Sequence, residues 1–184
     1  MLLTWATAPQ GRDERRCVAW RLVGALLADV GHDAATLDNP CTRCSGPHGA
    51  LVVTGAPWRA SIAYAGTFAV AAIAPETVHA FGIDAEPLID PVRDRAGWSG
   101  TGTDGVTTWV RTEAALKADG RGLRVEPQTV RIALGATGWT AHVPGRPAPL
   151  IGWDAASAPP GVFVALSAGA VPAAEAAPES RATC

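Results

Sequence analysis

Two segments with a helical spacing of apolar residues, each followed by several short extended runs, constrain the fold of this chain most. The first helix is predicted over residues 12–30, where apolar side chains recur every three or four positions from Val18 onward. The second is predicted over residues 105–119, with Asp104 as its N-cap. A chain of 184 residues is long enough for one compact domain, or for two small halves that share a core.

The runs that follow each helix read as strands, and the order helix-then-strands occurs twice. This order predicts an α+β fold of two similar halves forming a pseudo-dimer, each a small, mostly antiparallel sheet with a helix packed on it. The N-terminal half would span residues 1–87, the C-terminal half residues 88–167, and a flexible tail residues 168–184. The predicted strands are residues 50–54, 59–65, 67–74 and 78–86 in the first half, and 128–134, 139–143, 150–153 and 161–166 in the second.

The charged residues exclude some classes of protein. Fourteen of the 15 basic residues are Arg and only Lys117 is Lys; with 17 acidic residues the net charge is −2, which does not favour a nucleic-acid-binding surface. No apolar run has the roughly 20 residues of a membrane-spanning helix, and the first residues lack the pattern of a signal peptide. We therefore expect a cytoplasmic protein that binds no membrane, and the two internal halves favour a monomer.

Two carboxylates end the last predicted strand of the first half. Asp84 and Glu86 are two residues apart, so they share one face of the strand. Two carboxylates this close repel each other unless a cation lies between them, and hard oxygen ligands suit Mg²⁺. The alternative is a strand that simply runs into an acidic surface loop.

A third carboxylate occupies an unusual place on the second helix. Glu113 lies within the apolar stripe of that helix, so it is expected to be partly buried and to need a partner. Lys117 follows four residues later on the same side, and the plainest interpretation is an ion pair within the helix, which contributes about 0.3–0.5 kcal/mol. If this helix packs on the strand that carries Asp84 and Glu86, the four side chains would form a phosphate–metal site.

Both segments resemble motifs of the 4′-phosphopantetheinyl transferases. Residues 81–86 (FGIDAE) resemble the family's G-[VI]-D-x-E, and residues 109–123 (WVRTEAALKADGRGL) resemble W-x-x-K-E-A-x-x-K-x-x-G-x-G-L. Upstream, residues 47–49 (PHG) and 61–66 (SIAYAG) resemble the P-H-G and N-x-S-H-S-G segments. The order and the two-half layout are similar to the surfactin-type branch, and the resemblance covers most of residues 12–166.

This resemblance implies an enzyme that transfers 4′-phosphopantetheine from coenzyme A to a serine of an acyl or peptidyl carrier protein. Asp84, Glu86 and Glu113 would hold Mg²⁺ on the pyrophosphate of coenzyme A. Glu113 would also help to deprotonate the carrier serine. Lys117 would contact the phosphates and stabilise the departing 3′,5′-ADP. Such roles suit phosphoryl transfer, which depends mostly on positioning and charge neutralisation.

On the coenzyme A side, the resemblance implies contacts from His48, Gly49 and Tyr64, together with Asp84 and Lys117. The sequence departs from the family pattern where donors or cations are usual, which leaves open a homologue that binds coenzyme A or a carrier protein without transfer. A metal-dependent hydrolase of another phosphoanhydride is a further alternative, since the same site would serve water as the nucleophile. The departures are Ala50, Ala63, Tyr64 and Thr112.

A possible metal site of another kind lies in the loop before the P-H-G segment. Cys41 and Cys44, with His48 beyond them, have a spacing that begins many zinc sites. The alternative is a tight loop with two partly buried thiols, and with His48 near the coenzyme A pocket. A fourth ligand would have to be Cys17, His32 or Cys184.

Overall fold

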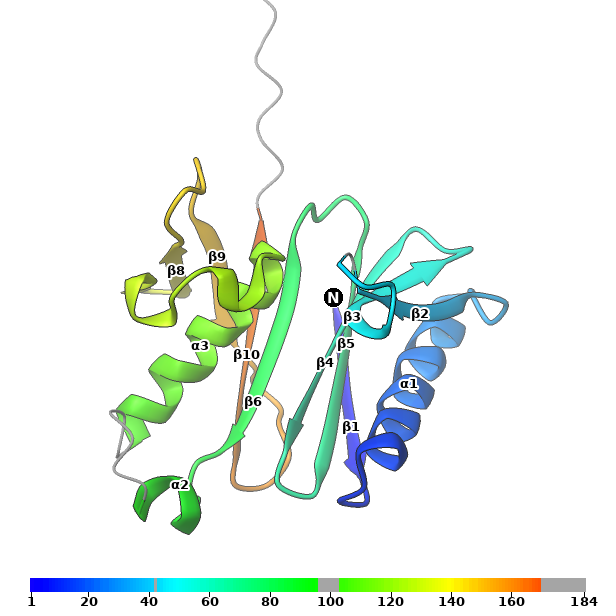
Figure 1. Cartoon of the computed structure of the whole chain (residues 1–184), viewed down its shortest axis with the longest axis horizontal. Helices are drawn as coiled ribbons and strands as arrows, with labels where there is room; N and C mark the ends of the chain where they lie inside the picture. Colours follow the sequence, from blue (N-terminus) through cyan, green and yellow to red (C-terminus); the bar gives the residue numbers. More distant parts are fainter. Residues whose placement is uncertain (42, 96–102, 170–184) are drawn as a thin grey trace, which may run out of the picture.

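Two antiparallel sheets, each carrying one long helix, form most of the protein in the computed structural model, which describes residues 1–41, 43–95 and 103–169 (Figure 1). A separate two-stranded hairpin lies beside the smaller sheet. The predicted α+β fold with small antiparallel sheets is therefore confirmed.

The smaller sheet has the strand order β1–β5–β4 and packs against helix α1. Buried side chains of α1, among them Val23 and Leu27, contact Ile73 of the sheet. Gly66, with a φ of 54°, forms the tight turn between β4 and β5 that the sequence predicts. The elements are β1 (Leu2–Thr7), α1 (Arg12–Asp29), β4 (Trp58–Ala65) and β5 (Phe68–Pro75).

The larger sheet has the order β6–β10–β9–β8–β7, and helix α3 lies across β6 and β10. Two short 3₁₀ turns, Gly122–Arg124 and Pro127–Thr129, lead from the helix back to the sheet. The elements are β6 (Phe81–Pro87), α3 (Thr103–Asp119), β7 (Arg131–Gly135), β8 (Gly138–His142), β9 (Leu150–Asp154) and β10 (Val162–Gly169).

The two larger sheets share one pattern of connection. In each, a first strand leads to a helix, and the last strand returns to pair antiparallel with the first: β5 with β1, and β10 with β6. This repeat agrees with two similar halves, although a pseudo-dimer stays a prediction. The predicted division after residue 87 assigned β6 to the N-terminal half, whereas its hydrogen-bonding partner β10 belongs to the C-terminal one.

Several local predictions differ from the structure. Strands β1 and β2 (Thr36–Pro40) were not predicted. β2 pairs with β3 (Pro47–Thr54), of which residues 50–54 were predicted as a strand. Helix α3 begins at Thr103, so Asp104 lies in its first turn and is not its N-cap. A short helix, α2 (Pro91–Arg95), interrupts the polar segment after β6. Of the predicted tail, residues 168 and 169 belong to β10 and residues 170–184 lie outside the described part of the chain.

Strand β6 has one apolar face and one face that carries Asp84. Phe81, Ile83 and Ala85 point into the apolar core between the two sheets, so Gly82 and Asp84 point to the other face, toward α3. The junction between the sheets is also tied by Ser61 of β4, whose Oγ accepts a hydrogen bond from the Ile83 backbone N–H at 3.0 Å.

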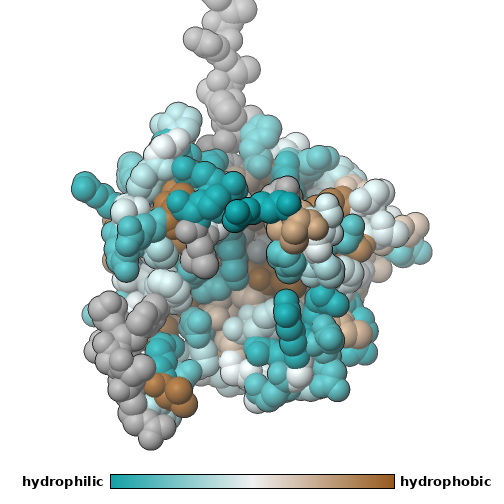
Figure 2. All heavy atoms as spheres, viewed as in Figure 1, coloured by the Kyte–Doolittle hydropathy of each residue, from teal (hydrophilic) through white to brown (hydrophobic). Residues whose placement is uncertain are grey.

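Polar residues cover most of the molecular face shown in Figure 2, and apolar residues are exposed there only in small separate patches. None of the helices in the described part of the chain has the length and apolar composition needed to span a bilayer.

Candidate functional site

Gly82 sets the distance between strand β6 and helix α3. A Cβ atom at this position would lie 2.5 Å from the Ala114 carbonyl oxygen and 2.8 Å from Lys117 Cβ, and closer still to the Ala118 backbone nitrogen. Only glycine allows so close an approach, and the helix therefore lies directly on the strand backbone. Asp84, next on the same face of β6, consequently faces the last turns of α3.

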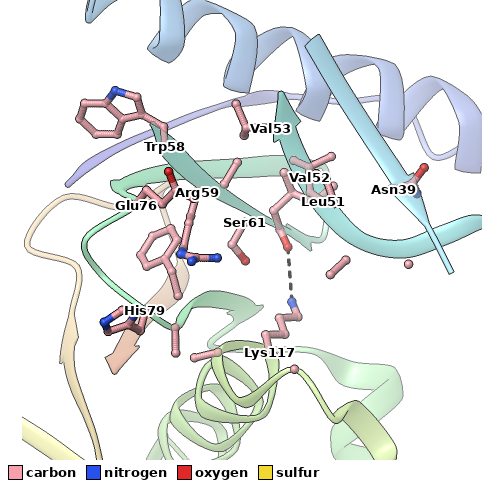
Figure 3. Close-up of a pocket in the computed structure, with 18 of the residues that line it drawn as sticks. Asn39, Leu51, Val52, Val53, Trp58, Arg59, Ser61, Glu76, His79 and Lys117 are labelled. Carbon is pink, nitrogen blue, oxygen red and sulfur yellow. Dashed lines mark hydrogen bonds between the residues drawn. The ribbon is translucent and has the colours of Figure 1, made fainter. Parts of the chain in front are cut away.

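Lys117 connects three elements at this point. Its Nζ donates to Asp84 Oδ1 on β6 at 2.8 Å. It also donates to the Ile62 carbonyl oxygen on β4 at 3.4 Å, the dashed line in Figure 3. The Asp84 side chain is only 12% exposed, against 36% for Lys117. Burial raises the pKa of Asp84, and the charge and hydrogen bond of Lys117 oppose that rise. The ion pair that the structure records for Lys117 therefore joins helix to strand, rather than lying within the helix.

Glu86 and Glu113 lie within electrostatic reach of Asp84. Glu113 is half-buried, as its place on the apolar stripe of α3 predicts. For both glutamates burial raises the pKa most, and the negative charge of Asp84 raises the pKa further. Arg93 of α2, whose Nη1 lies 3.9 Å from Glu86 Oε2, partly offsets this. The structure thus gathers three carboxylates that are costly to ionise together.

The three carboxylates fit a Mg²⁺ ion that is bound partly by the protein and partly by water or substrate, rather than one enclosed by protein ligands alone. Among the described residues, the Asp84, Glu86 and Glu113 oxygens do not all lie within 4.8 Å of one another. Mg²⁺ commonly keeps several waters and binds through one or two carboxylates together with substrate phosphates. Because the three carboxylates repel one another, a cation among them would favour their ionised forms, and waters or substrate phosphates would complete its shell.

A cavity of about 610 Å³ opens beside Lys117, between β3, β4 and the C-terminal end of α3 (Figure 3). Its volume is within the range of pockets that hold small molecules. Polar side chains point into it from both sides, with Arg59 held by a 2.8 Å hydrogen bond from its Nε to the Val78 carbonyl. Polar residues of the lining are Asn39, Arg59, Ser61, Glu76, His79 and Lys117.

His79 and Asn39 were not predicted as site residues. His79 lies in the connection between β5 and β6, and Asn39 lies on the unpredicted strand β2. Asn39 joins the cavity because the β2–β3 hairpin packs beside β4, a non-local arrangement that residue spacing does not reveal.

Besides Asp84 and Lys117, three residues were predicted to contact coenzyme A, and each of the three lies in different surroundings. Gly49 lines the cavity together with Lys117. His48, its neighbour on β3, instead places Nε2 3.0 Å from Cys44 Sγ. Tyr64 packs against α1, with the Arg15 guanidinium 4.7 Å above its ring, and burial raises the pKa of its hydroxyl.

Comparison with known proteins found no matching family model and no matching curated protein. Any functional assignment therefore depends on the residues of the site. Chemically, the site offers one ammonium group, three clustered carboxylates and an adjoining cavity large enough for part of a nucleotide-like ligand.

Proposed function

We propose that this chain transfers 4′-phosphopantetheine from coenzyme A to a serine of an acyl or peptidyl carrier protein, with Mg²⁺ as cofactor. One observation carries the proposal. Lys117, the single lysine of the chain, pairs with Asp84 at the edge of a cavity, and Glu86 and Glu113 both interact electrostatically with that aspartate.

In this proposal each of the four charged residues has a role in the transfer. Asp84, Glu86 and Glu113 would hold Mg²⁺, which when bound neutralises charge on the pyrophosphate. Lys117 would add a compact positive charge where the departing 3′,5′-ADP develops its negative charge. A new bond forms between the serine oxygen and the β-phosphorus, the pyrophosphate bond breaks, and the serine proton passes to a base.

Glu113 would act as the base for that proton. Burial raises its pKa, and the neighbouring charge of Asp84 raises it further. A raised pKa makes a carboxylate a stronger proton acceptor once it is ionised, which suits general base catalysis near neutral pH.

A second candidate function is binding of coenzyme A or a carrier protein without transfer. It is favoured by the surroundings of two predicted coenzyme A contacts, since His48 interacts with Cys44 and Tyr64 lies beneath Arg15. For the first candidate, Arg59 and His79 in the cavity lining would have to provide cationic or hydrogen-bonding contacts instead. Under either proposal we expect a monomer that acts in the cytoplasm.

Mass spectrometry of carrier proteins tests the transfer. The chain is incubated with coenzyme A, Mg²⁺ and a wide panel of acyl and peptidyl carrier proteins, and we expect at least one to gain the mass of one phosphopantetheine group. Glu113→Gln and Lys117→Arg should lose most of this activity while keeping the fold. The matched control is Glu126→Gln, the same change at an exposed position outside the cavity.

Calorimetry with coenzyme A separates the two candidates. Mg²⁺-dependent binding that is lost in Glu113→Gln, together with carrier modification, supports the transferase. Binding without modification of any carrier supports the non-catalytic candidate. If coenzyme A does not bind and no carrier gains mass, the proposal is wrong.

A further inference from the structure

Three potential metal ligands meet at the tip of the β2–β3 hairpin. The Sγ atoms of Cys41 and Cys44 and a ring nitrogen of His48 all lie within 4.8 Å of one another, and this is the one such group of three among the described residues. Both cysteines are free thiols. The cluster lies partly exposed at the surface, and the transfer reaction proposed above makes no use of the two cysteines.

The backbone of the loop holds the ligands on one side. The Cys41 N–H donates to the Gly46 carbonyl at 2.8 Å, and the Ser45 N–H donates to the Cys41 carbonyl at 2.8 Å, which closes the loop. Directly after the second cysteine, Ser45 adopts a φ of 58°, and no other non-glycine residue in the described ranges has a positive φ. Such a conformation costs roughly 1–3 kcal/mol and recurs at ligand clamps, where the surroundings enforce it.

The distances suit a tetrahedral ion with little rearrangement. Zn–S bonds of about 2.3 Å and Zn–N bonds of about 2.0 Å place ligand sulfur and nitrogen atoms roughly 3.5 Å apart. Cys44 Sγ and His48 Nε2 now lie 3.0 Å apart and share a hydrogen bond, so they need separate by only about half an ångström. Gly46 leaves room for this, since a Cβ there would press on both groups at 3.2–3.4 Å.

We propose that Cys41, Cys44 and His48 bind one Zn²⁺ ion. Two sulfur–zinc bonds and one nitrogen–zinc bond form, and the two thiol protons pass to solvent. Neither Cys17 nor His32 belongs to the group, and Cys184, the other predicted candidate for a fourth ligand, lies outside the described residues. A water molecule would complete the tetrahedron at this exposed site. The ion would fix the end of the hairpin whose strand β3 forms a wall of the cavity.

This site would also change the part that His48 plays. A zinc-bound imidazole cannot at the same time donate from that nitrogen to a phosphate, so His48 would support the cavity wall instead of contacting coenzyme A. Zinc binding itself does not depend on the transfer reaction and can be tested without it.

Cobalt substitution tests the proposal directly. The reduced full-length protein is titrated with Co²⁺ under an inert atmosphere, and we expect one equivalent to produce a sulfur-to-cobalt charge-transfer band and the intense visible bands of a tetrahedral site. Added Zn²⁺ should remove both, because zinc binds more tightly to such ligands. Cys44→Ser should weaken binding by at least about 100-fold, since loss of even an outer-shell partner costs 10- to 100-fold.

Cys17→Ser is the matched control, because Cys17 is an exposed cysteine outside the cluster. It should leave the spectrum and affinity unchanged, whereas His48→Ala should keep the sulfur band but weaken binding and alter the visible bands. The proposal is overturned if the reduced wild-type protein shows no sulfur–cobalt band, or if Cys17→Ser and Cys44→Ser reduce it equally. Circular dichroism of each variant shows whether its fold is retained.

Discussion

Replacing Gly82 with alanine should damage both stability and the candidate site, because this glycine sets the separation of β6 and α3. The new Cβ would lie 2.5 Å from the Ala114 carbonyl oxygen, and the atoms it meets are backbone atoms or a Cβ of the helix, which cannot rotate away. To reach even the tightest separations found for real Cβ atoms, 3.0–3.4 Å, the helix must withdraw by about 0.5–0.9 Å.

The size of the effect follows from this displacement. Overpacking of a buried contact costs about 1–3 kcal/mol. For a chain of this length each kilocalorie lowers the melting temperature by about 2–4 °C, so we expect a fall of about 2–12 °C. The Lys117–Asp84 hydrogen bond, now 2.8 Å, would lengthen with the helix to about 3.3–3.7 Å and weaken, so any transfer activity should fall more steeply than stability.

Differential scanning calorimetry and the carrier-modification assay measure the two effects. Gly24→Ala is the matched control, since Gly24 is an exposed glycine inside α1 and a Cβ there would meet nothing within 4 Å. That change should raise stability by about 0.5–1 kcal/mol. A Gly82→Ala protein as stable and as active as the wild type would refute the close approach of helix and strand.

Three further predictions concern charged groups. Burial works against ionisation of Asp119, but three hydrogen bonds from Arg121 and Arg146 outweigh it and lower the pKa of this carboxyl group. The stability that Asp119 provides is therefore present above its unfolded pKa and lost as pH falls through its folded pKa. Asp119→Asn should remove about 1.5–3 kcal/mol at neutral pH and flatten the acid side of the stability–pH curve measured by urea denaturation. Asp154→Ala removes the acceptor of the Trp139 indole N–H at 3.0 Å and of two Arg111 hydrogen bonds at 2.7 and 3.0 Å. Urea denaturation should show a loss of about 1–3 kcal/mol, and an unchanged midpoint would contradict these contacts. Burial and the neighbouring carboxylate of Asp84 raise the pKa of Glu113, so the stability of the wild type falls as pH rises through the folded-state pKa of this group. In the absence of Mg²⁺, Glu113→Gln should therefore have a higher melting temperature than the wild type at neutral pH. The control Glu126→Gln should leave the melting temperature unchanged.

Periodicity was sufficient for the two long helices and most strands. Helix α1 and strands β4 and β5 lie within one residue of their predicted bounds, because their side chains alternate or recur with the period of the element itself. Strand β2 was missed because Asp38, Asn39 and Pro40 are poor strand formers, and its pairing with β3 supplies the hydrogen bonds that its composition does not favour. Strand β1 was missed although it pairs with β5 over six residues.

The sequence by itself determined that Asp84 and Glu86 share a face and that Glu113 lies on an apolar stripe, because strand and helix periods fix such relations locally. Only the tertiary structure decided which partner Lys117 takes. The residue spacing predicted an ion pair with Glu113, one helical turn away. The close packing of α3 on Gly82 instead puts the Lys117 ammonium group against Asp84, a buried carboxylate whose ionised form is costly without a cation beside it. The cavity and the cysteine–histidine cluster likewise depend on how the β2–β3 hairpin closes and packs, and non-local contacts of this kind leave no period in the sequence.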